Sequence, residues 1–503
     1  MFTFSYPVPI ISVWILWEWY TFTTTRNKLA EIPTIGPDTF VWSYLSAWRF
    51  VFAAKSMIQE GGEKYPNGIF KVYTLEAPSR WLVVVNGEKF TQELTSAKEH
   101  HLSKMAALLD LIQAKWTLGK DAHKPAYHID VIQCYMTRHL TVILTGMADE
   151  VHHSIKDTIS LSDEWVEYPC MDVISRVICR SINRAFVGLP SCRDKEYLEI
   201  QRKFGVTFMA SSYSLNLLPK FLKGIVAKMI VPYSKTIQRL DSFCNSLLTQ
   251  RRQNRKEPGT YCEGGERDLV SGLLDVVPVE DQTAHDLGYR LTIVNFASVH
   301  TTSIATSNII LELAARQSYI SNLREEVERV IATYGWTKEA MENMVMLESF
   351  MMEVSRHFEI SAIGIPRQAV KDFTFSNGIT IPVGCSVATS TANIHMSSDF
   401  YQNPDEFDGY RYLKRKEDGH GHSLKQRMVG LGKNYLFFGS GRHPCPGRVF
   451  ATIEMKCILA ELLLNYDFKL PPDGNPPSGW FGTLRFPKAK SKVLFRKRRS
   501  VKG

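Results

Sequence analysis

The chain is poor in cysteine, and none of its cysteines form a Cys-x-x-Cys pair. Nine cysteines are spread over 503 residues, an odd number without regular spacing. A disulfide framework and a structural zinc site both need paired cysteines, so the sequence argues against both and favours a reducing compartment. Internal repeats and low-complexity tracts are also missing. Its 44% of hydrophobic and 22% of charged residues are typical of a globular protein.

A strong charge of one sign is missing too. The formal net charge is +9 at pH 7, and the basic residues form no stripe interleaved with aromatic ones. Nucleic-acid binding is therefore not indicated. The modest basic excess fits an acidic protein partner or an anionic membrane surface.

The N-terminus carries a short apolar segment. Residues 2–20 are mostly apolar and aromatic, with one acidic residue and two prolines, and two basic residues follow by position 28. A helix needs about 20 apolar residues to span a membrane, so this segment is only just long enough. No small-residue cleavage site precedes the basic residues, which disfavours a cleaved signal peptide. We predict a membrane anchor at residues 1–24 with the downstream chain in the cytosol. An interfacial helix is the alternative.

Prolines and a glycine follow this segment. The run Ile32-Pro-Thr-Ile-Gly-Pro37 predicts a stiff hinge within residues 25–37. Most of residues 38–320 show helical periodicity with short β-rich patches, and residues 365–390 change to strands and turns. The sequence thus predicts one domain over residues 38–503 that is mainly α-helical with small β-sheets.

Cys445 lies in a loop rich in glycine and proline, Phe438-Gly-Ser-Gly-Arg-His-Pro-Cys-Pro-Gly447, which precedes a long apolar helical pattern. A cysteine must lose its proton to bind a metal, and free N–H groups at the start of a helix stabilise the thiolate. The glycines let the backbone approach a flat cofactor closely. The loop therefore indicates a metal-ligating cysteine, and a buried structural cysteine beside a turn is the alternative.

A possible ion pair precedes this loop. Glu353 and Arg356 are three residues apart in a helical run and share one helix face. Such a pair is usually exposed and contributes little on its own. Here the pair lies about ninety residues before Cys445, with Arg411 between them. Because of this position, we consider a structural role for the pair as well as an exposed one.

Consecutive hydroxyl residues interrupt another apolar helical run. His300 and Thr301 lie in Phe296-Ala-Ser-Val-His-Thr-Thr-Ser303, within the run from residue 291 to residue 315. Three successive hydroxyl side chains are poor helix formers and compete for backbone hydrogen bonds. We expect a local opening there that holds water or oxygen against a cofactor. The alternative is a buried helix whose hydroxyls bond to their own carbonyls.

In this order and spacing, the three motifs resemble those of the cytochromes P-450. Phe438, Gly441, Cys445 and Gly447 are in register with the haem-binding loop of that family, and His443 replaces the usual arginine. The resemblance implies that Cys445 is the axial ligand of the iron of haem b. A thiolate in that place donates electron density to the metal and favours O–O bond cleavage.

The resemblance also implies roles for the other two motifs. Glu353, Arg356 and Arg411 correspond to a buried charge network behind the haem that fixes the cysteine loop. Thr301 corresponds to the hydroxyl that delivers protons on the oxygen side, and His300 replaces the acidic residue expected beside it. We therefore predict Thr301 and His300 as catalytic residues.

Haem propionates need cationic partners. Arg367, in Ile365-Pro-Arg-Gln368, resembles a family position that meets a propionate, and His443 is the second candidate. On an early helix the family has a Trp-x-x-x-Arg pattern that binds a propionate, and no clear match to it is present in this sequence. The alternatives there are Trp116 with Lys120, His128 and Arg138.

The segment from Tyr213 to Tyr233 is strongly apolar, with interleaved lysines. Two interpretations stay open. It is a buried helix whose lysines reach outward, or, as the resemblance implies, it covers the substrate pocket and touches the bilayer.

The function that the resemblance implies is a haem-thiolate monooxygenase of the fungal, membrane-bound, secondary-metabolism type, similar to ent-kaurene oxidases. Such an enzyme inserts one atom of O2 into a C–H bond of a small lipophilic substrate, here a terpenoid, with two electrons from NADPH. The alternatives are a reductase-independent peroxygenase or rearranging enzyme, and a non-catalytic haem-binding membrane protein.

The expected location is the endoplasmic reticulum membrane, with a single N-terminal anchor and the catalytic domain on the cytosolic side. The expected partners are membrane lipid and an acidic NADPH–cytochrome P-450 reductase. The basic residues near the cysteine loop that we expect to face this reductase are Lys425, Arg427, Lys433, Arg442 and Arg448.

Overall fold

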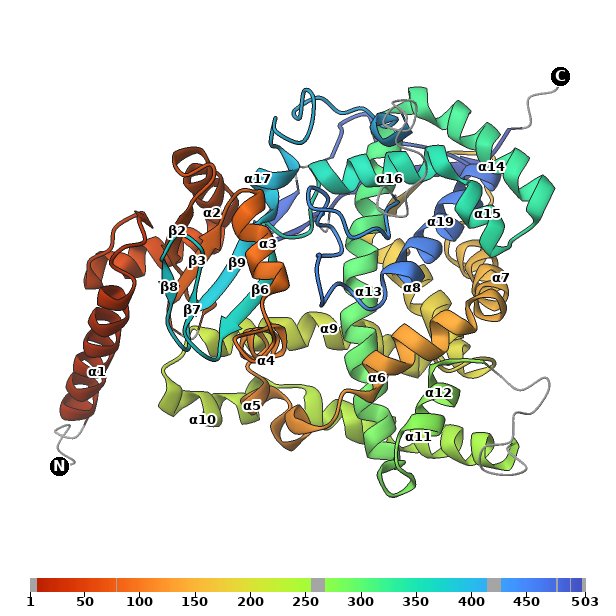
Figure 1. Cartoon of the computed structure of the whole chain (residues 1–503). Helices are drawn as coiled ribbons and strands as arrows, with labels where there is room; N and C mark the ends of the chain where they lie inside the picture. Colours follow the sequence, from red (N-terminus) through yellow and green to blue (C-terminus); the bar gives the residue numbers. More distant parts are fainter. Residues whose placement is uncertain are drawn as a thin grey trace.

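A long helix, α13 (Ala284–Ala315), runs through the middle of the molecule, with other helices around it and the main β-sheet to its left in Figure 1. This computed structural model describes residues 7–77, 79–254, 267–413, 427–475, 478–488 and 490–499. The 32 residues of α13 correspond to about 48 Å of helix. Most of its sides are buried, as is typical of a core helix in a large protein.

The other described helices surround α13 and follow one another along most of the chain. They are α1 (Pro7–Lys28), α2 (Phe40–Lys64), α3 (Glu88–Ser96), α4 (Lys104–Leu111), α5 (Ala114–Thr117), α6 (Tyr127–Asp130), α7 (Leu140–Thr158), α8 (Cys170–Phe186), α9 (Lys195–Asn216), α10 (Lys220–Ile230), α11 (Tyr233–Asn254), α12 (Leu269–Val276), α14 (Ile320–Tyr334), α15 (Lys338–Asn343), α16 (Val345–His357), α17 (Thr391–His395) and α19 (Arg448–Asn465). There are also four short 3-10 helices among the described residues, η1 (Gly119–His123), η3 (Ser191–Arg193), η4 (Val279–Asp281) and η5 (Gln317–Tyr319), and a π-helical segment, η2 (Val131–Met136).

The strands form one six-stranded sheet and three small ones. The large sheet has the order β1-β2-β3-β9-β6-β4, and the others are β10-β13-β5, β11-β12 and β7-β8. Their bounds are β1 (Thr34–Ile35), β2 (Ile69–Tyr73), β3 (Trp81–Val85), β4 (Leu102–Ser103), β5 (Val166–Pro169), β6 (Ile363–Ala369), β7 (Phe373–Thr374), β8 (Thr380–Ile381), β9 (Ser386–Ser390), β10 (Tyr466–Lys469), β11 (Gly479–Phe481), β12 (Leu484–Phe486) and β13 (Lys492–Lys497). The predicted mainly helical fold with small sheets is confirmed.

The central hairpin of the large sheet is buried on both faces. Strands β2 and β3 are antiparallel and pair Phe70 with Val84, and every residue of both strands is buried. Phe50 and Met57 of α2 join the apolar cluster on one face, while Trp81 lies in the cluster on the other. Burial on both faces explains the nearly continuous run of β-branched and aromatic residues.

Residues 25–37, expected to be a hinge, are bound to the sheet. Strand β1 pairs in parallel with β2, and Leu29 and Ile32 are buried. The ammonium group of Lys71 in β2 donates hydrogen bonds to the backbone carbonyls of Leu29, at 2.8 Å, and of Ile32. The segment therefore holds α1 firmly to the folded body.

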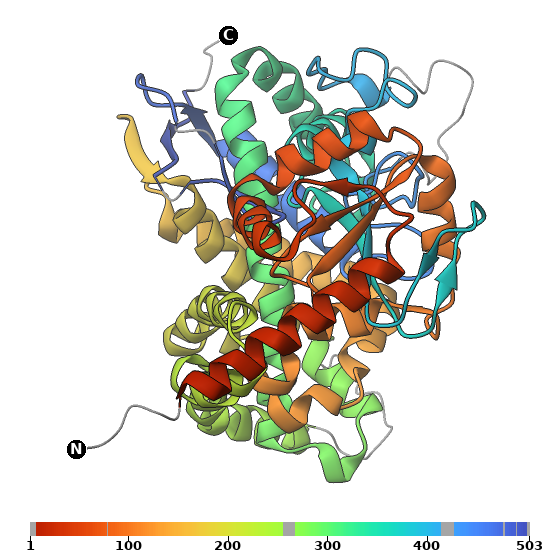
Figure 2. The same cartoon turned by 90° about the vertical axis from the view of Figure 1, so that its left-hand side faces the viewer.

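Helix α1 itself lies along the outside of the molecule (Figure 2). Its C-terminal part is attached through Phe22, which is buried and stacks on Trp81 with ring centroids 5.6 Å apart. In the part of the chain described here, no helix has both the length and the hydropathy needed to cross a membrane. The transmembrane anchor predicted for residues 1–24 is therefore not supported.

The apolar segment 213–233 is divided between the end of α9, all of α10 and the start of α11. Helix α10 buries only Ala227 completely. Its large apolar side chains Phe221, Ile225 and Met229 are 55%, 64% and 78% exposed. Of the two interpretations left open by the sequence, the fully buried helix does not hold for α10.

Candidate active site

The cysteine loop is a tight turn that ends at the start of α19. The backbone N–H of Cys445 donates to the carbonyl of Phe438 at 2.8 Å. Gly439 and Gly441 have φ angles of 75° and 74°, which other residues rarely adopt. A β-carbon at Gly441 would also lie 2.6 Å from the carbonyl oxygen of Thr95. Glycine is therefore required at position 441 both by conformation and by space.

The Cys445 side chain is half-buried, and cationic groups surround its loop. Burial raises the pKa of the Cys445 thiol, whereas the backbone N–H of Gly447 and the charges of Lys104 and Arg448 act in the opposite direction. Arg448 donates to the carbonyl of Cys445 at 3.1 Å and to that of Val429 at 3.2 Å. This environment favours a thiolate once a metal compensates for the burial.

Lys104, which the sequence analysis did not single out, reaches the same loop from the start of α4. Its ammonium group donates to the carbonyls of His443 at 3.0 Å and of Pro444 at 3.4 Å. Burial lowers the pKa of Lys104, although the nearby Cys445 opposes this shift. Nothing in the sequence around a single lysine indicates that it meets a loop more than 300 residues later.

Arg367 is a buried cation for which no ion pair within 4 Å is present among the described residues, although the charge of Glu99 acts on it from farther away. Its side chain is 2% exposed, and its Nη1 donates to the carbonyl of the adjacent Pro366. Its Nε is buried and has no hydrogen-bond partner among the described residues, and burial lowers its pKa. Burying a guanidinium group without an ion-pair partner destabilises the folded state. A bound anion, such as a carboxylate, would therefore stabilise this site.

The other predicted propionate partners differ in their surroundings. His443 lies with Nε2 3.3 Å from Oε2 of Glu99 and is partly exposed. His128 is buried, its Nδ1 has no partner among the described residues, and burial lowers its pKa to about 4. Lys120 and Arg138 are exposed, and Trp116 packs against Gly224 of α10.

Glu353, Arg356 and Arg411 meet as the resemblance implied. The two side chains of α16 form two hydrogen bonds of 2.8 and 2.9 Å, and Arg411 Nε lies 3.0 Å from Glu353 Oε1. Glu353 and Arg356 are fully buried. Although burial alone would raise it, these bonds hold the pKa of Glu353 far below its usual value.

His395 connects this network to the cysteine loop. Its carbonyl accepts a 2.8 Å hydrogen bond from Arg356, and its ring Nε2 accepts one of 3.0 Å from the N–H of Leu436. Burial lowers the pKa of His395 to about 3, so the ring is neutral and accepts this bond. Leu436 stands two residues before Phe438, where the loop begins. The network thus reaches the loop by a path that the sequence did not reveal.

Helix α13 runs through the Thr301 region without interruption, so the expected local opening is absent there. The Thr301 hydroxyl donates to the carbonyl of Ala297 at 2.8 Å, and that of Ser298 to Val294 at 2.7 Å. Thr301 and Ala297 are exposed, although residues on the other sides of this part of the helix are buried. One face in the middle of a core helix is therefore open.

His300 points in another direction. A β-carbon at Gly205 of α9 would lie 2.1 Å from its Cδ2 and 2.2 Å from its Nε2. Burial lowers the pKa of His300. The ring therefore packs between α13 and α9, and it is a neighbour of Thr301 in sequence but not on the same helix face.

These features fit haem. Cys445 would supply the thiolate, Arg367 suits a propionate, and Lys104 adds a second cation near the loop. Thr301 contributes an exposed hydroxyl on α13. Helix α19, which follows the cysteine loop, packs against α13.

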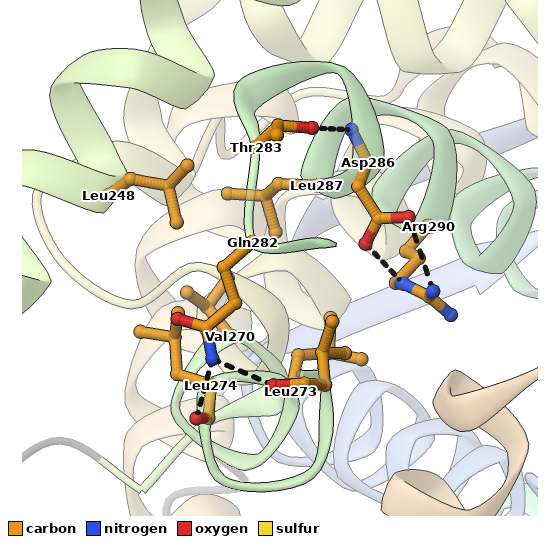
Figure 3. Close-up of a pocket in the computed structure, with 10 residues that line it drawn as sticks. Leu248, Val270, Leu273, Leu274, Gln282, Thr283, Asp286, Leu287 and Arg290 are labelled. Atoms are coloured by element: carbon orange, nitrogen blue, oxygen red, sulfur yellow. Dashed lines mark hydrogen bonds and ion pairs between the residues drawn. The ribbon is translucent and has the colours of Figure 1, made fainter. Parts of the chain in front are cut away.

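A crevice elsewhere does not have these properties. It lies between α11, α12 and α13 and is lined mainly by leucine and valine side chains, with Gln282 and the Asp286–Arg290 ion pair at its edge (Figure 3). Its volume of about 10 Å³ holds about one water molecule. The Gln282 amide is bound to the carbonyls of Leu274 and Val277, so this crevice is structural.

Comparison with known proteins agrees with this site. The sequence model of the family described as Cytochrome P450 matches residues 52–495, and the chain belongs to this family. It is 35% identical over 499 residues to cytochrome P450 monooxygenase 103 of the fungus Postia placenta, covering 98% of this chain and 99% of that one. It is 29% identical over 509 residues to cytochrome P450 monooxygenase janQ of Penicillium janthinellum, covering 98% of each chain.

The fold also matches a solved structure, retinoic acid bound cyanobacterial CYP120A1. The TM-score is 0.66 at 19% sequence identity, over 93% of this chain and 98% of that one. The chain is thus a cytochrome P450 monooxygenase, an oxidoreductase that uses haem iron with a cysteine thiolate, O2, an organic substrate and a redox partner.

Proposed function

We propose that this monooxygenase oxidises a lipophilic terpenoid in fungal secondary metabolism. The motif variant around Cys445 and the His300–Thr301 sequence resemble terpenoid-oxidising fungal enzymes, and the relatives reported above are fungal. The observation that carries the haem-dependent part is the buried Arg367, whose Nε has no hydrogen-bond partner among the described residues and whose charge acts on Lys104 beside the Cys445 loop.

In this proposal each residue has a defined task. When bound, the haem supplies the oxygen-activating chemistry. Cys445 would ligate its iron, while Arg367 and Lys104, which lie near the cysteine loop, would hold its propionates. The Thr301 hydroxyl donates a hydrogen bond to the Ala297 carbonyl, so its oxygen can still accept a hydrogen bond on the exposed face, and we assign it the relay of a proton there. Glu353, Arg356, Arg411 and His395 keep the loop in place.

We propose that an apolar side of the molecule rests on the endoplasmic reticulum membrane, with the catalytic domain in the cytosol. Helices α1, α2 and α10 all lie on the left in Figure 1, and Figure 2 shows α1 running across that side. The exposed large apolar residues of this side, here called the apolar face, are Leu16, Trp17 and Tyr20 of α1, Trp42, Leu45 and Phe52 of α2, and Phe221, Ile225 and Met229 of α10. Clustered tryptophan, tyrosine and aliphatic side chains suit a membrane interface.

The proposed electron donor is NADPH–cytochrome P-450 reductase. Of the basic residues near the loop, Arg427 is bound to Glu348 and Arg448 to backbone carbonyls. Lys433 is exposed but forms an ion pair with Glu88 at 2.7 Å, and Arg442 is exposed. Lys425 lies outside the described residues. The surface that would attract an acidic partner is therefore smaller than the sequence suggested.

Feeding a panel of terpene skeletons to microsomes that contain this chain and the reductase tests the substrate class. We expect an oxygenated product from at least one skeleton, dependent on NADPH and O2. Turnover of sugars or free amino acids with no binding of any terpenoid would refute the substrate class. Product formed with peroxide but not with NADPH would favour a peroxygenase instead.

A further inference from the structure

His300 and Gly205 occupy the same small space where α13 packs against α9. An added β-carbon at Gly205 would approach two atoms of the imidazole ring to 2.1 and 2.2 Å. Side-chain atoms do not come this close, so the ring fills the space that any larger residue at 205 would need. A substitution at Gly205 must therefore displace either the His300 ring or helix α9.

The protonation state and direction of His300 suit packing better than proton transfer. Burial lowers its pKa, and the charge of Arg202 acts the same way, although the Arg202 backbone opposes it. The ring is therefore neutral near pH 7. Its Nε2 faces Gly205, is buried and has no hydrogen-bond partner among the described residues, whereas the Thr301 side chain is exposed on α13.

Helix α9 is also bound to the segment that precedes α5. Ser212 donates to the carbonyl of Ile112 at 3.1 Å, and Asn216 to that of Leu111 at 3.3 Å. Helix α10, with its exposed apolar side chains, follows shortly after α9. If α9 shifts, it therefore pushes on α13 at His300, the residue that precedes Thr301.

We propose that His300 is a positioning residue: its ring, seated against Gly205, sets the position of the Thr301 segment relative to α9 and does not itself transfer a proton. This inference rests on the proposed role of Thr301. It assigns to Gly205 a function that neither its sequence context nor the resemblance indicates.

Thermal unfolding of the full-length, haem-loaded protein tests the contact without any substrate. Gly205→Ala is expected to lower Tm, and the double variant Gly205→Ala/His300→Ala to melt higher than Gly205→Ala alone. Gly288→Ala is the matched control, because a β-carbon there lies 3.6 Å from its nearest neighbour and has room. Losses in Tm that simply add in the double variant would overturn the contact.

The second measurement is the hydrogen peroxide released per NADPH consumed in the presence of reductase. Gly205→Ala is expected to raise this ratio several-fold, and His300→Leu, which fills the space without a titratable group, to stay close to the wild type across pH 6–8. If His300→Leu releases as much peroxide as Thr301→Ala, or removes an inflection from the pH profile, His300 donates protons and the proposal is overturned.

The Tm and peroxide measurements distinguish a failure of this inference from a failure of the proposed function. A protein without the carbon monoxide spectrum of a thiolate-ligated haem contradicts the proposed function, and the role at Thr301 falls with it. The Tm comparison still decides whether Gly205 and His300 act through direct contact.

Discussion

The cysteine-loop side and the apolar face are built in opposite ways. Around the loop, buried side chains from distant parts of the chain converge on backbone carbonyls and N–H groups: Arg356 and Leu436 meet at His395, and Lys104 and Arg448 hold the loop itself. On the apolar face, α10 buries one residue and leaves its large side chains exposed.

This difference fits the two tasks that we propose for these regions. A side chain that ligates a metal must keep its position closely, so the residues around it hold it by hydrogen bonds and packing. An apolar surface that meets lipid needs exposed area and few specific contacts. Disturbing the first region should cost stability and haem, whereas disturbing the second should change only where the protein resides.

The largest effect is expected from Glu353→Ala. The substitution leaves Arg356 and Arg411 buried without their carboxylate, which typically costs about 3–5 kcal/mol. We expect this loss in urea unfolding, together with loss of bound haem. Lys338→Ala is the control, because its pair with Glu342 has both side chains about half exposed and should contribute less than about 1 kcal/mol. Similar losses from the two variants would contradict the account.

A second buried carboxylate gives a pH-dependent test. Burial alone would raise the pKa of Glu348, but Lys456 and Arg427 hold it at about 2. A depressed folded-state pKa contributes stability above the usual value of 4.5, and this stability is lost as the pH falls from 4.5 towards 2. The contribution is on the order of 3 kcal/mol. Glu348→Gln should therefore flatten the loss of stability between pH 5 and pH 2, measured by urea unfolding.

The pH slope has its own control. Glu280→Gln removes an exposed carboxylate for which no ion pair is present among the described residues, and it should leave the slope unchanged. A slope that survives in Glu348→Gln would place the acid sensitivity elsewhere.

How far the sequence reaches differs between the two regions. Cys445, Glu353, Arg356 and Arg411 stand in short motifs, so the class of the protein and the core of the site could be predicted. Lys104 and His395 could not, because their partners are distant in sequence and a single lysine or histidine has no distinguishing context.

Three further features depend on contacts between distant parts of the chain and could not be predicted either. Composition shows that residues 25–37 break regular structure, but not that Lys71 binds the carbonyls that follow α1. The exposure of α10 depends on where the neighbouring helices pack, and the spacing of apolar residues in the sequence does not predict that. The contact of His300 with Gly205 required the crossing of two helices that are far apart in the chain.

On the apolar face, Ile225→Glu combined with Met229→Glu should weaken binding to lipid vesicles by at least about tenfold, since each buried apolar side chain contributes about 1.5–3 kcal/mol. Stability should change by less than about 0.5 kcal/mol, because both side chains are exposed. Val142→Glu is the control, because Val142 is also exposed and belongs to α7, which lies on the right in Figure 1, away from α10. Vesicle sedimentation that is equal for both variants would exclude α10 from the membrane contact.

The smallest effect is expected at the surface near the loop. Lys433→Glu with Arg442→Glu should slow the first electron transfer by a factor of about two to five at low salt, and the difference should shrink as ionic strength rises. Stopped-flow reduction measures this rate, and Lys235→Glu on α11 is the control for an exposed charge elsewhere. A rate that does not depend on salt would refute electrostatic steering.

The central claim is that Cys445 binds haem iron through its thiolate in a loop held by the Glu353 network. The most direct measurement is the spectrum of the reduced carbon monoxide complex of the wild type and of Cys445→Ser. The account predicts the red-shifted Soret band of thiolate ligation in the wild type and its loss in the variant. A wild-type spectrum typical of histidine-ligated haem, or a red-shifted band that persists in Cys445→Ser, would contradict it.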